Sequence, residues 1–145
     1  AILFHSAVFD RSRADGPARS AALLRERLGA TLPAATLARA EALTHAIARQ
    51  ELPETQDPSL RGDAALLLDM DNAWMGGPPA VFDATEAAIR REYAHLDADR
   101  YAAGRAAALR MLLWRERIFR TDRFQLANEK RARRNLERRL DQLGG

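Results

Sequence analysis

The chain has 145 residues, of which 47% are hydrophobic and 30% charged, and its formal net charge is +3. This size and composition are typical of one soluble globular domain with a real core. The sequence contains no cysteine, which excludes disulfides, thiolate catalysis and cysteine-based zinc sites. Its apolar runs fall well short of the ~20 residues that a membrane span needs, so no membrane partner is expected.

Residues 1–9 are apolar apart from His5 and Ser6, which predicts part of a buried helix. The stretch has neither an initiating methionine nor a basic leader. We therefore expect residues upstream of it and a cytoplasmic location. A polar loop follows over 10–17, with a Gly-Pro break.

The next elements are predicted to be two helices and a long loop. Apolar residues at helical spacing indicate helices over about 18–29 and 33–49, the first ending at Gly29. Two prolines and Gly62 predict a loop over 50–62. A loop of that length in a small domain is often functional.

Residues 63–75 are expected to form a central buried helix that ends at the Gly-Gly-Pro-Pro run 76–79. This apolar stretch contains Asp69 and Asp71, and a carboxylate in such a place needs a metal ion, an arginine or N–H donors to compensate it. Residues two apart on a helix point roughly 200° away from each other. At most one of the two therefore faces a given cleft, and one salt bridge plus one surface carboxylate is the alternative.

Three further helices are predicted in the second half. They run over about 80–95, 98–114 and 122–143, with Asp97 or Asp99 capping the second and Thr121 capping the third. Strand formers are scarce. The sequence thus predicts a single all-α domain over 1–145, arranged as an orthogonal helical bundle.

Positive charge is concentrated near the end of the chain, where residues 105–140 hold 12 basic and 4 acidic residues. This segment suits contact with phosphates, and a solvated helix face is the alternative. Arg90, Arg91 and Arg105 are candidates for holding phosphate, with salt bridges between helices as the competing interpretation. Aromatic residues do not interleave with the basic run, so nucleic-acid binding is the least favoured function.

Histidines supply the remaining candidates for chemistry. His5 with Asp71 has the ligand types of a divalent-metal site, although neither lies in a local metal-binding spacing. A packed core histidine is the alternative for His5. His45 is expected to pack in the core or at its rim, and we assign no chemistry to His95.

Several short segments are informative because of their order along the chain. They are Phe4-His5-Ser6-Ala7-Val8-Phe9-Asp10, Arg19-Ser20-Ala21, Leu67-Leu68-Asp69-Met70-Asp71, Ile89-Arg90-Arg91-Glu92-Tyr93, Gly104-Arg105, Arg117-Ile118-Phe119-Arg120-Thr121, Phe124, Glu129 and Ala132-Arg133-Arg134-Asn135-Leu136. Together they resemble a bacterial group of predicted metal-dependent phosphohydrolases of the HD superfamily. The resemblance covers nearly the whole chain and is best in its C-terminal half.

The resemblance implies an all-α HD-like domain that binds a divalent ion (Mn, Mg, Fe or Zn) through a His, a His-Asp pair and a distant Asp. By position His5 is the His of the pair and Asp71 the distant Asp, with Asp69 as the second choice. The ion would activate water for attack on a phosphate ester.

The departures from the family pattern fall on the residues that carry its chemistry. Ser6 stands where the pair needs Asp, the earlier His would lie upstream of Ala1, and His45-Ala46 replaces a His-His pair. Gly16 and Pro17 likewise occupy positions at which the family tends to have Asn-Glu. Losses in a unit of catalytic groups cost orders of magnitude in rate.

Two functions of different class follow. One is a metal-dependent phosphohydrolase acting on a nucleotide or another phosphate ester. The other is a catalytically inactive relative that keeps the fold as a binding or assembly module, and either function leaves a homo-oligomer open. Both depend on His5 and the acidic pair sharing one hollow.

Overall fold

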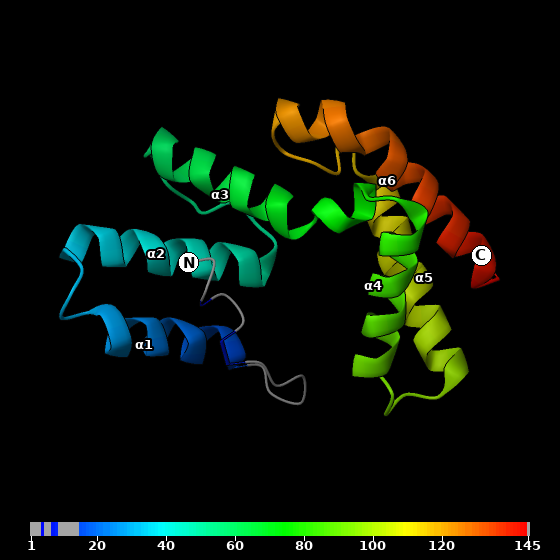
Figure 1. The fold of residues 1–145 in the computed structure, drawn as a ribbon, viewed down its shortest axis with the longest axis horizontal. Coiled ribbons are helices and arrows are strands. Elements are labelled where there is room, and N and C mark those ends of the chain that lie inside the picture. Colours follow the sequence, from blue (N-terminus) through cyan, green and yellow to red (C-terminus); the bar gives the residue numbers. More distant parts are fainter. Residues whose placement is uncertain (1–3, 5–6, 9–14, 145) are drawn as a thin grey trace. The chain divides into compact units, whose positions relative to one another are not determined.

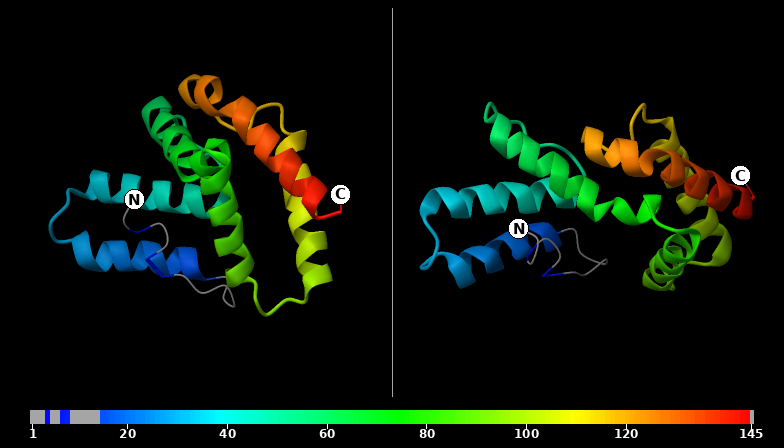
Figure 2. Two further views of the ribbon diagram at one scale, coloured as in Figure 1. Left: turned by 45° about the vertical axis from the view of Figure 1, so that its right-hand side comes forward. Right: turned by 45° about the horizontal axis from the view of Figure 1, so that its top comes forward.

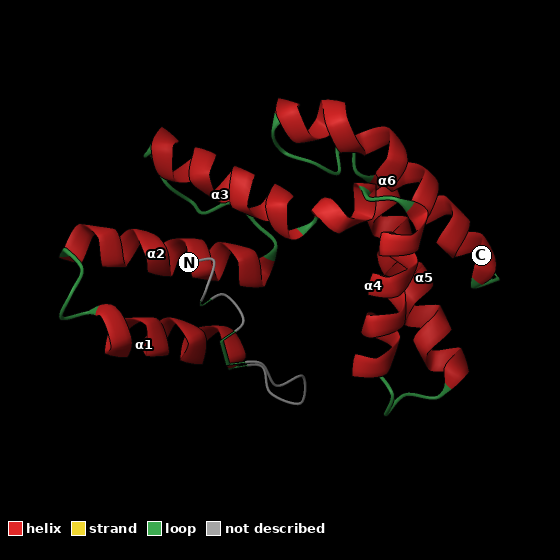
Figure 3. Cartoon of the chain, in the orientation of Figure 1, coloured by secondary structure: helices red, strands yellow, loops and turns green. Residues whose placement is uncertain are grey.

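The computed structural model describes residues 4, 7, 8 and 15–144 (Figure 1). In this part of the chain every regular element is helical, and Figure 3 shows no strand among the residues described. The all-α fold class is therefore confirmed, while the HD-like arrangement stays a prediction. None of the described helices combines the length and apolar character that crossing a bilayer requires.

The chain divides into two compact units, residues 1–71 and 72–145, and each is described by itself. The first contains α1 (Gly16–Leu28), α2 (Ala34–Arg49) and α3 (Pro58–Asp71). Helix α2 packs against both α1 and α3, and Figures 1 and 2 show α1 beside α2. Its core is made of small and aliphatic side chains: Ala21, Leu24, Ala46, Ile47, Ala64, Leu67 and Leu68.

The N-terminal segment joins α1 through a buried serine. Val8 donates its backbone N–H to Ser20 Oγ at 3.0 Å, and that hydroxyl donates to the Val8 carbonyl at 3.3 Å. Phe4, Ala7 and Val8 lie in turns and bends, where the sequence predicted a helix over 1–9. The rest of that predicted helix, with His5 and Ser6, lies outside the described residues.

The second unit contains a short 3₁₀ helix η1 (Ala73–Gly76), then α4 (Pro79–Glu92), α5 (Ala98–Trp114) and α6 (Asp122–Gln142). Helix α6 packs on both η1 and α5, while α4 packs on η1. Counted over the described residues, its core is more aromatic than that of the first unit. It contains Met75, Phe82, Leu109, Ile118, Phe119, Ala132 and Leu136.

The predicted helix boundaries hold for α5 and α6, and both caps form. Asp97 accepts from the backbone N–H of Arg100 at 2.8 Å, and Thr121 accepts from that of Phe124 at 3.4 Å. The predicted central helix 63–75 is wrong at both ends. Helix α3 begins five residues earlier, at Pro58, and ends four residues earlier, at Asp71. The predicted loop 50–62 is correspondingly shorter.

Candidate functional site

The two candidate metal-binding carboxylates lie in the last turn of α3 and have different surroundings. Asp69 is buried, with 1% of its surface exposed, whereas Asp71 is exposed. Asp71 Oδ2 accepts a hydrogen bond from Gln50 Nε2 at 2.9 Å. Gln50 is the left-handed residue that caps α2, so this contact ties the ends of α2 and α3 together.

These carboxylates do not complete a metal-ligand set within the described residues. No group of three or more His, Asp or Glu side chains suited to a metal ion occurs there. His5 lies outside the described residues, so its convergence with Asp69 and Asp71 stays a prediction. The described donors alone do not make up the ligand set that the resemblance implies, and we derive no catalytic step through a metal ion.

Arg105 lies in a buried ion cluster that joins three helices. Glu86 of α4 is only 3% exposed, and it accepts from Arg105 Nε of α5 at 3.2 Å and through a second bond from the same guanidinium. Arg139 Nε of α6 donates to the same carboxylate at 3.1 Å. Arg105 thus forms the salt bridge between helices that was the alternative to phosphate binding.

The other two candidate phosphate ligands lie in the last turn of α4. Arg90 donates to the carbonyls of Tyr93 at 2.8 Å and Leu96 at 3.2 Å, and its guanidinium lies 4.7 Å from the centroid of the Tyr101 ring. These contacts hold the turn that leads into α5. Arg91 is exposed on the last turn of α4.

Two further charged residues of α6 organise the loop between α5 and α6. Glu129 accepts from the backbone N–H groups of Ile118 at 3.0 Å and Phe119 at 3.2 Å. Arg133 pairs with Glu129 and donates to three carbonyls at the end of α5, including that of Leu113 at 3.0 Å. The segment that resembles the phosphohydrolase group most closely is therefore held by its own side chains.

Sequence reasoning missed Glu86, Arg139 and Glu129 as organising residues. One signal was available for Glu86. It lies one helical turn after Phe82 and therefore on the same buried stripe, where a carboxylate requires a cationic partner. The identity of that partner had no local signal.

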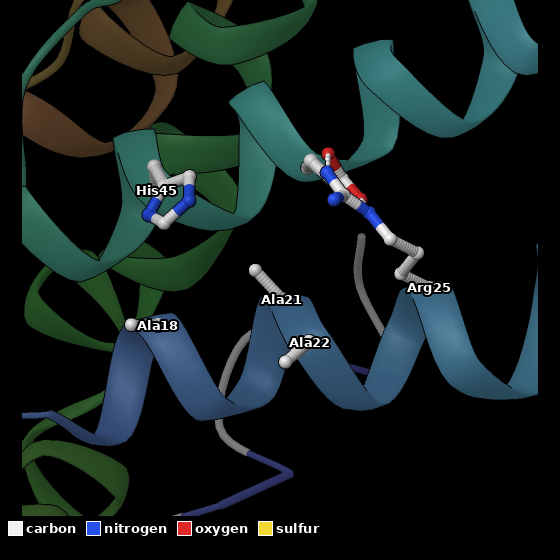
Figure 4. Close-up of a pocket in the computed structure, with 6 residues that line it drawn as sticks. Ala18, Ala21, Ala22, Arg25 and His45 are labelled. Carbon is white, nitrogen blue, oxygen red and sulfur yellow. Dashed lines mark hydrogen bonds and ion pairs between the residues drawn. The ribbon is translucent and has the colours of Figure 1, made fainter.

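His45 lines a small pocket between α1 and α2, as expected for a residue at the core rim. The pocket has a volume of about 200 Å³, and its floor is formed by alanines of α1. Figure 4 shows the imidazole above Ala18 and Ala21, with Arg25 reaching up from α1. Arg25 donates to both oxygens of Glu41, at 2.7 and 2.6 Å.

The two oppositely charged residues of the pocket, Arg25 and Glu41, bind each other. The hydrogen bonds from Arg25 hold the pKa of Glu41 below its ordinary value, with smaller contributions from the charges of Arg25 and His45. The only guanidinium among the described residues that line the pocket is thus already bound to a carboxylate of the same pocket. Two of its nitrogens bind Glu41, while the Arg25 side chain as a whole stays 69% exposed.

No protein-family model, curated protein or solved structure matches the chain. The resemblance to the HD superfamily therefore depends on the quoted segments alone and stays a prediction.

Proposed function

We propose that this chain is a phosphohydrolase-like protein of the HD superfamily that acts by binding and assembly and no longer catalyses hydrolysis. One observation carries the proposal. Arg105, the phosphate-binding candidate in the best-matching half of the chain, is bound together with Arg139 to the buried carboxylate of Glu86. A guanidinium engaged in this way stabilises the fold and would have to leave a buried charge unpaired in order to bind a phosphate.

The remaining matching segments support the same conclusion. Glu129 and Arg133 bind backbone groups around the α5–α6 loop, and Arg90 binds carbonyls after α4. Each of these charged side chains therefore has a role in holding the helices. The matches lie in the scaffold, whereas the departure Ser6 falls at a position that would supply a metal ligand and Ala46 replaces the second His of an expected His-His pair.

Metal binding and hydrolysis test this proposal directly. The melting temperature is measured with and without millimolar Mn²⁺, Mg²⁺, Fe²⁺ or Zn²⁺. Hydrolysis of p-nitrophenyl phosphate and of nucleotides is measured under the same conditions. A metal present at 100 times its Kd would add about 2.7 kcal/mol to the free energy of unfolding. We expect no such stabilisation and no metal-dependent hydrolysis.

The outcome that overturns the proposal is specific. It is a metal-dependent rise in melting temperature together with hydrolysis, both lost in Asp71→Asn. That variant keeps an oxygen that can accept from Gln50 Nε2 but removes the charge that a metal ion requires. A nucleotide or another phosphate ester would then be the substrate. Gln50→Ala is the matched control, because it removes the hydrogen bond to Asp71 but leaves the Asp71 carboxylate, and so its charge, in place.

A further inference from the structure

Helix α5 exposes large apolar side chains on the side opposite its buried residues. Tyr101, Ala106 and Leu109 are buried in the second unit. The opposite side exposes a stripe that we call the outer face of α5: Arg100, Ala103, Gly104, Ala107, Arg110, Met111 and Trp114. Met111 is 68% exposed and Trp114 is 90% exposed. Neighbouring large apolar side chains that are exposed beside polar ones are typical of a contact surface.

The outer face is symmetric about Ala107. At about 100° per residue, positions 100, 103, 104, 107, 110, 111 and 114 form one stripe along the helix. The half before Ala107 carries small side chains, Ala103 and Gly104, whereas the half after it carries Met111 and Trp114. A Cβ added at Gly104 would meet no atom within 4 Å, so a neighbouring molecule can approach the helix backbone closely there.

This pattern is complementary to itself when two copies run antiparallel. With the two-fold axis at Ala107, the small Ala103 of one copy faces the large Met111 side chain of the other, and the open surface at Gly104 faces Arg110. Arg100, whose side chain is 80% exposed, then lies opposite the exposed indole of Trp114, an arrangement suited to a cation–π contact. A parallel pair would instead place Trp114 against Trp114 and leave the small residues facing each other.

The charges at the ends of α5 favour the same orientation. Asp97 and Asp99 stand at its N-terminal end with Arg100, which pairs with Asp97 at 3.5 Å, and Arg115 follows its C-terminal end. With the axis at Ala107, an antiparallel pair places Asp99 of each helix opposite Arg115 of the other and also opposes the two helix dipoles. A parallel pair would place like charges together.

We propose that the outer face of α5 is a homodimer interface at which a second copy of this chain packs antiparallel about Ala107. The inference rests on the assembly role proposed above and names the partner. The dimer has closed two-fold symmetry, so it does not propagate into a filament.

Single-cysteine crosslinking tests the interface, because the natural chain contains no cysteine. Ala107→Cys lies on the two-fold axis, so we expect mild oxidation to give a covalent dimer. Trp114→Cys, far from its own counterpart, should give little, and so should Ala127→Cys, an exposed control position on α6. Efficient crosslinking of Trp114→Cys without that of Ala107→Cys would overturn the antiparallel geometry.

Sedimentation across micromolar to millimolar concentrations tests the association itself. The wild-type chain should show a monomer–dimer equilibrium, and Gly104→Leu and Trp114→Ser should each weaken it by about tenfold or more. The matched control is Leu126→Ser, because Leu126 is an equally exposed apolar residue, 93% exposed, that belongs to α6 and not to α5. Because Gly104 is an open helical position, Gly104→Leu should not lower the helix content of the monomer.

A chain that stays monomeric throughout overturns the inference, including the case in which another part of the same chain covers α5. A dimer that Gly104→Leu and Trp114→Ser leave intact overturns it as well. Neither result depends on metal binding or hydrolysis, which are measured separately. Failure of the interface is therefore distinguishable from failure of the proposed function.

Discussion

Glu86 is the residue on which the packing of α4, α5 and α6 most depends. Its carboxylate is 3% exposed and is bound by two guanidinium groups that are themselves 14% and 22% exposed. Breaking a buried pair from one side is expensive, because the remaining charge loses its partner in a place that water reaches poorly. Here one substitution would leave two cations unpaired.

We therefore expect Glu86→Ala to lower the free energy of unfolding by about 3 kcal/mol or more. The matched control is Asp83→Ala, one turn earlier on α4, whose partner Arg138 is bound at 2.7 Å in a more exposed pair. The control should cost less than about 1 kcal/mol. Urea denaturation gives the free energy of unfolding of both variants. Equal decreases would show that burial does not make the Glu86 cluster more stabilising than the exposed pair.

At the scale of an element, side chains of α6 hold η1 and the residue after it by hydrogen bonds to successive backbone carbonyls. Asn135 Nδ2 donates to the carbonyls of Met75 at 2.9 Å and Gly77 at 3.0 Å, and Arg131 Nε donates to that of Gly76 at 2.7 Å. A Cβ at Gly76 would come within 2.5 Å of Asn128 Cβ and 2.9 Å of its carbonyl oxygen. The turn and the helix can approach this closely because residue 76 has no side chain.

Gly76→Ala should therefore destabilise the protein by about 1–3 kcal/mol, because the methyl group has to push α6 away from η1. Gly62→Ala in α3 is the opposite case. A Cβ there meets nothing within 4 Å, and the change should stabilise the helix by up to about 1 kcal/mol. Thermal denaturation measures whether each variant gains or loses stability. An unchanged stability of Gly76→Ala would mean that η1 and α6 can move apart without an energetic cost.

The elements that sequence reasoning places well are those with local signals. Helices α5 and α6 combine helical spacing with a capping Asp97 or Thr121, and both lie where predicted. The start of α3 had a local signal too, since Asp57 precedes Pro58 and accepts from the N–H of Ser59 at 2.8 Å. The predicted loop 50–62 nevertheless included this first part of the helix.

The end of α3 and the ion cluster had no such signal. The 3₁₀ turn that follows Asp71 is stabilised by Asn135, which lies 60 residues from Met75 along the chain. Arg139 lies 53 residues from Glu86. Spacing rules cover three or four residues, so the sequence shows that a buried carboxylate needs a partner but does not identify the partner.

At the scale of the whole molecule, the apolar core is divided unequally between the two units. Among the residues that the structure describes, the first unit buries mainly alanine and leucine, whereas the second buries Phe82 and Phe119 and adds ring contacts such as that between Trp74 and Phe82 at 5.4 Å. Aromatic side chains bury the most surface per residue, and local stability follows the amount of apolar contact. The first unit should accordingly be the less stable one.

Two spectroscopic probes distinguish the units, because both tryptophans, Trp74 and Trp114, belong to the second. Far-ultraviolet circular dichroism reports helices of both units, whereas tryptophan fluorescence reports only the second. On heating, we expect loss of ellipticity to begin before the fluorescence change. Trp114→Phe removes the exposed reporter and should leave the later transition in place. Coincident transitions for both probes would mean that the chain unfolds as one cooperative unit despite its two cores.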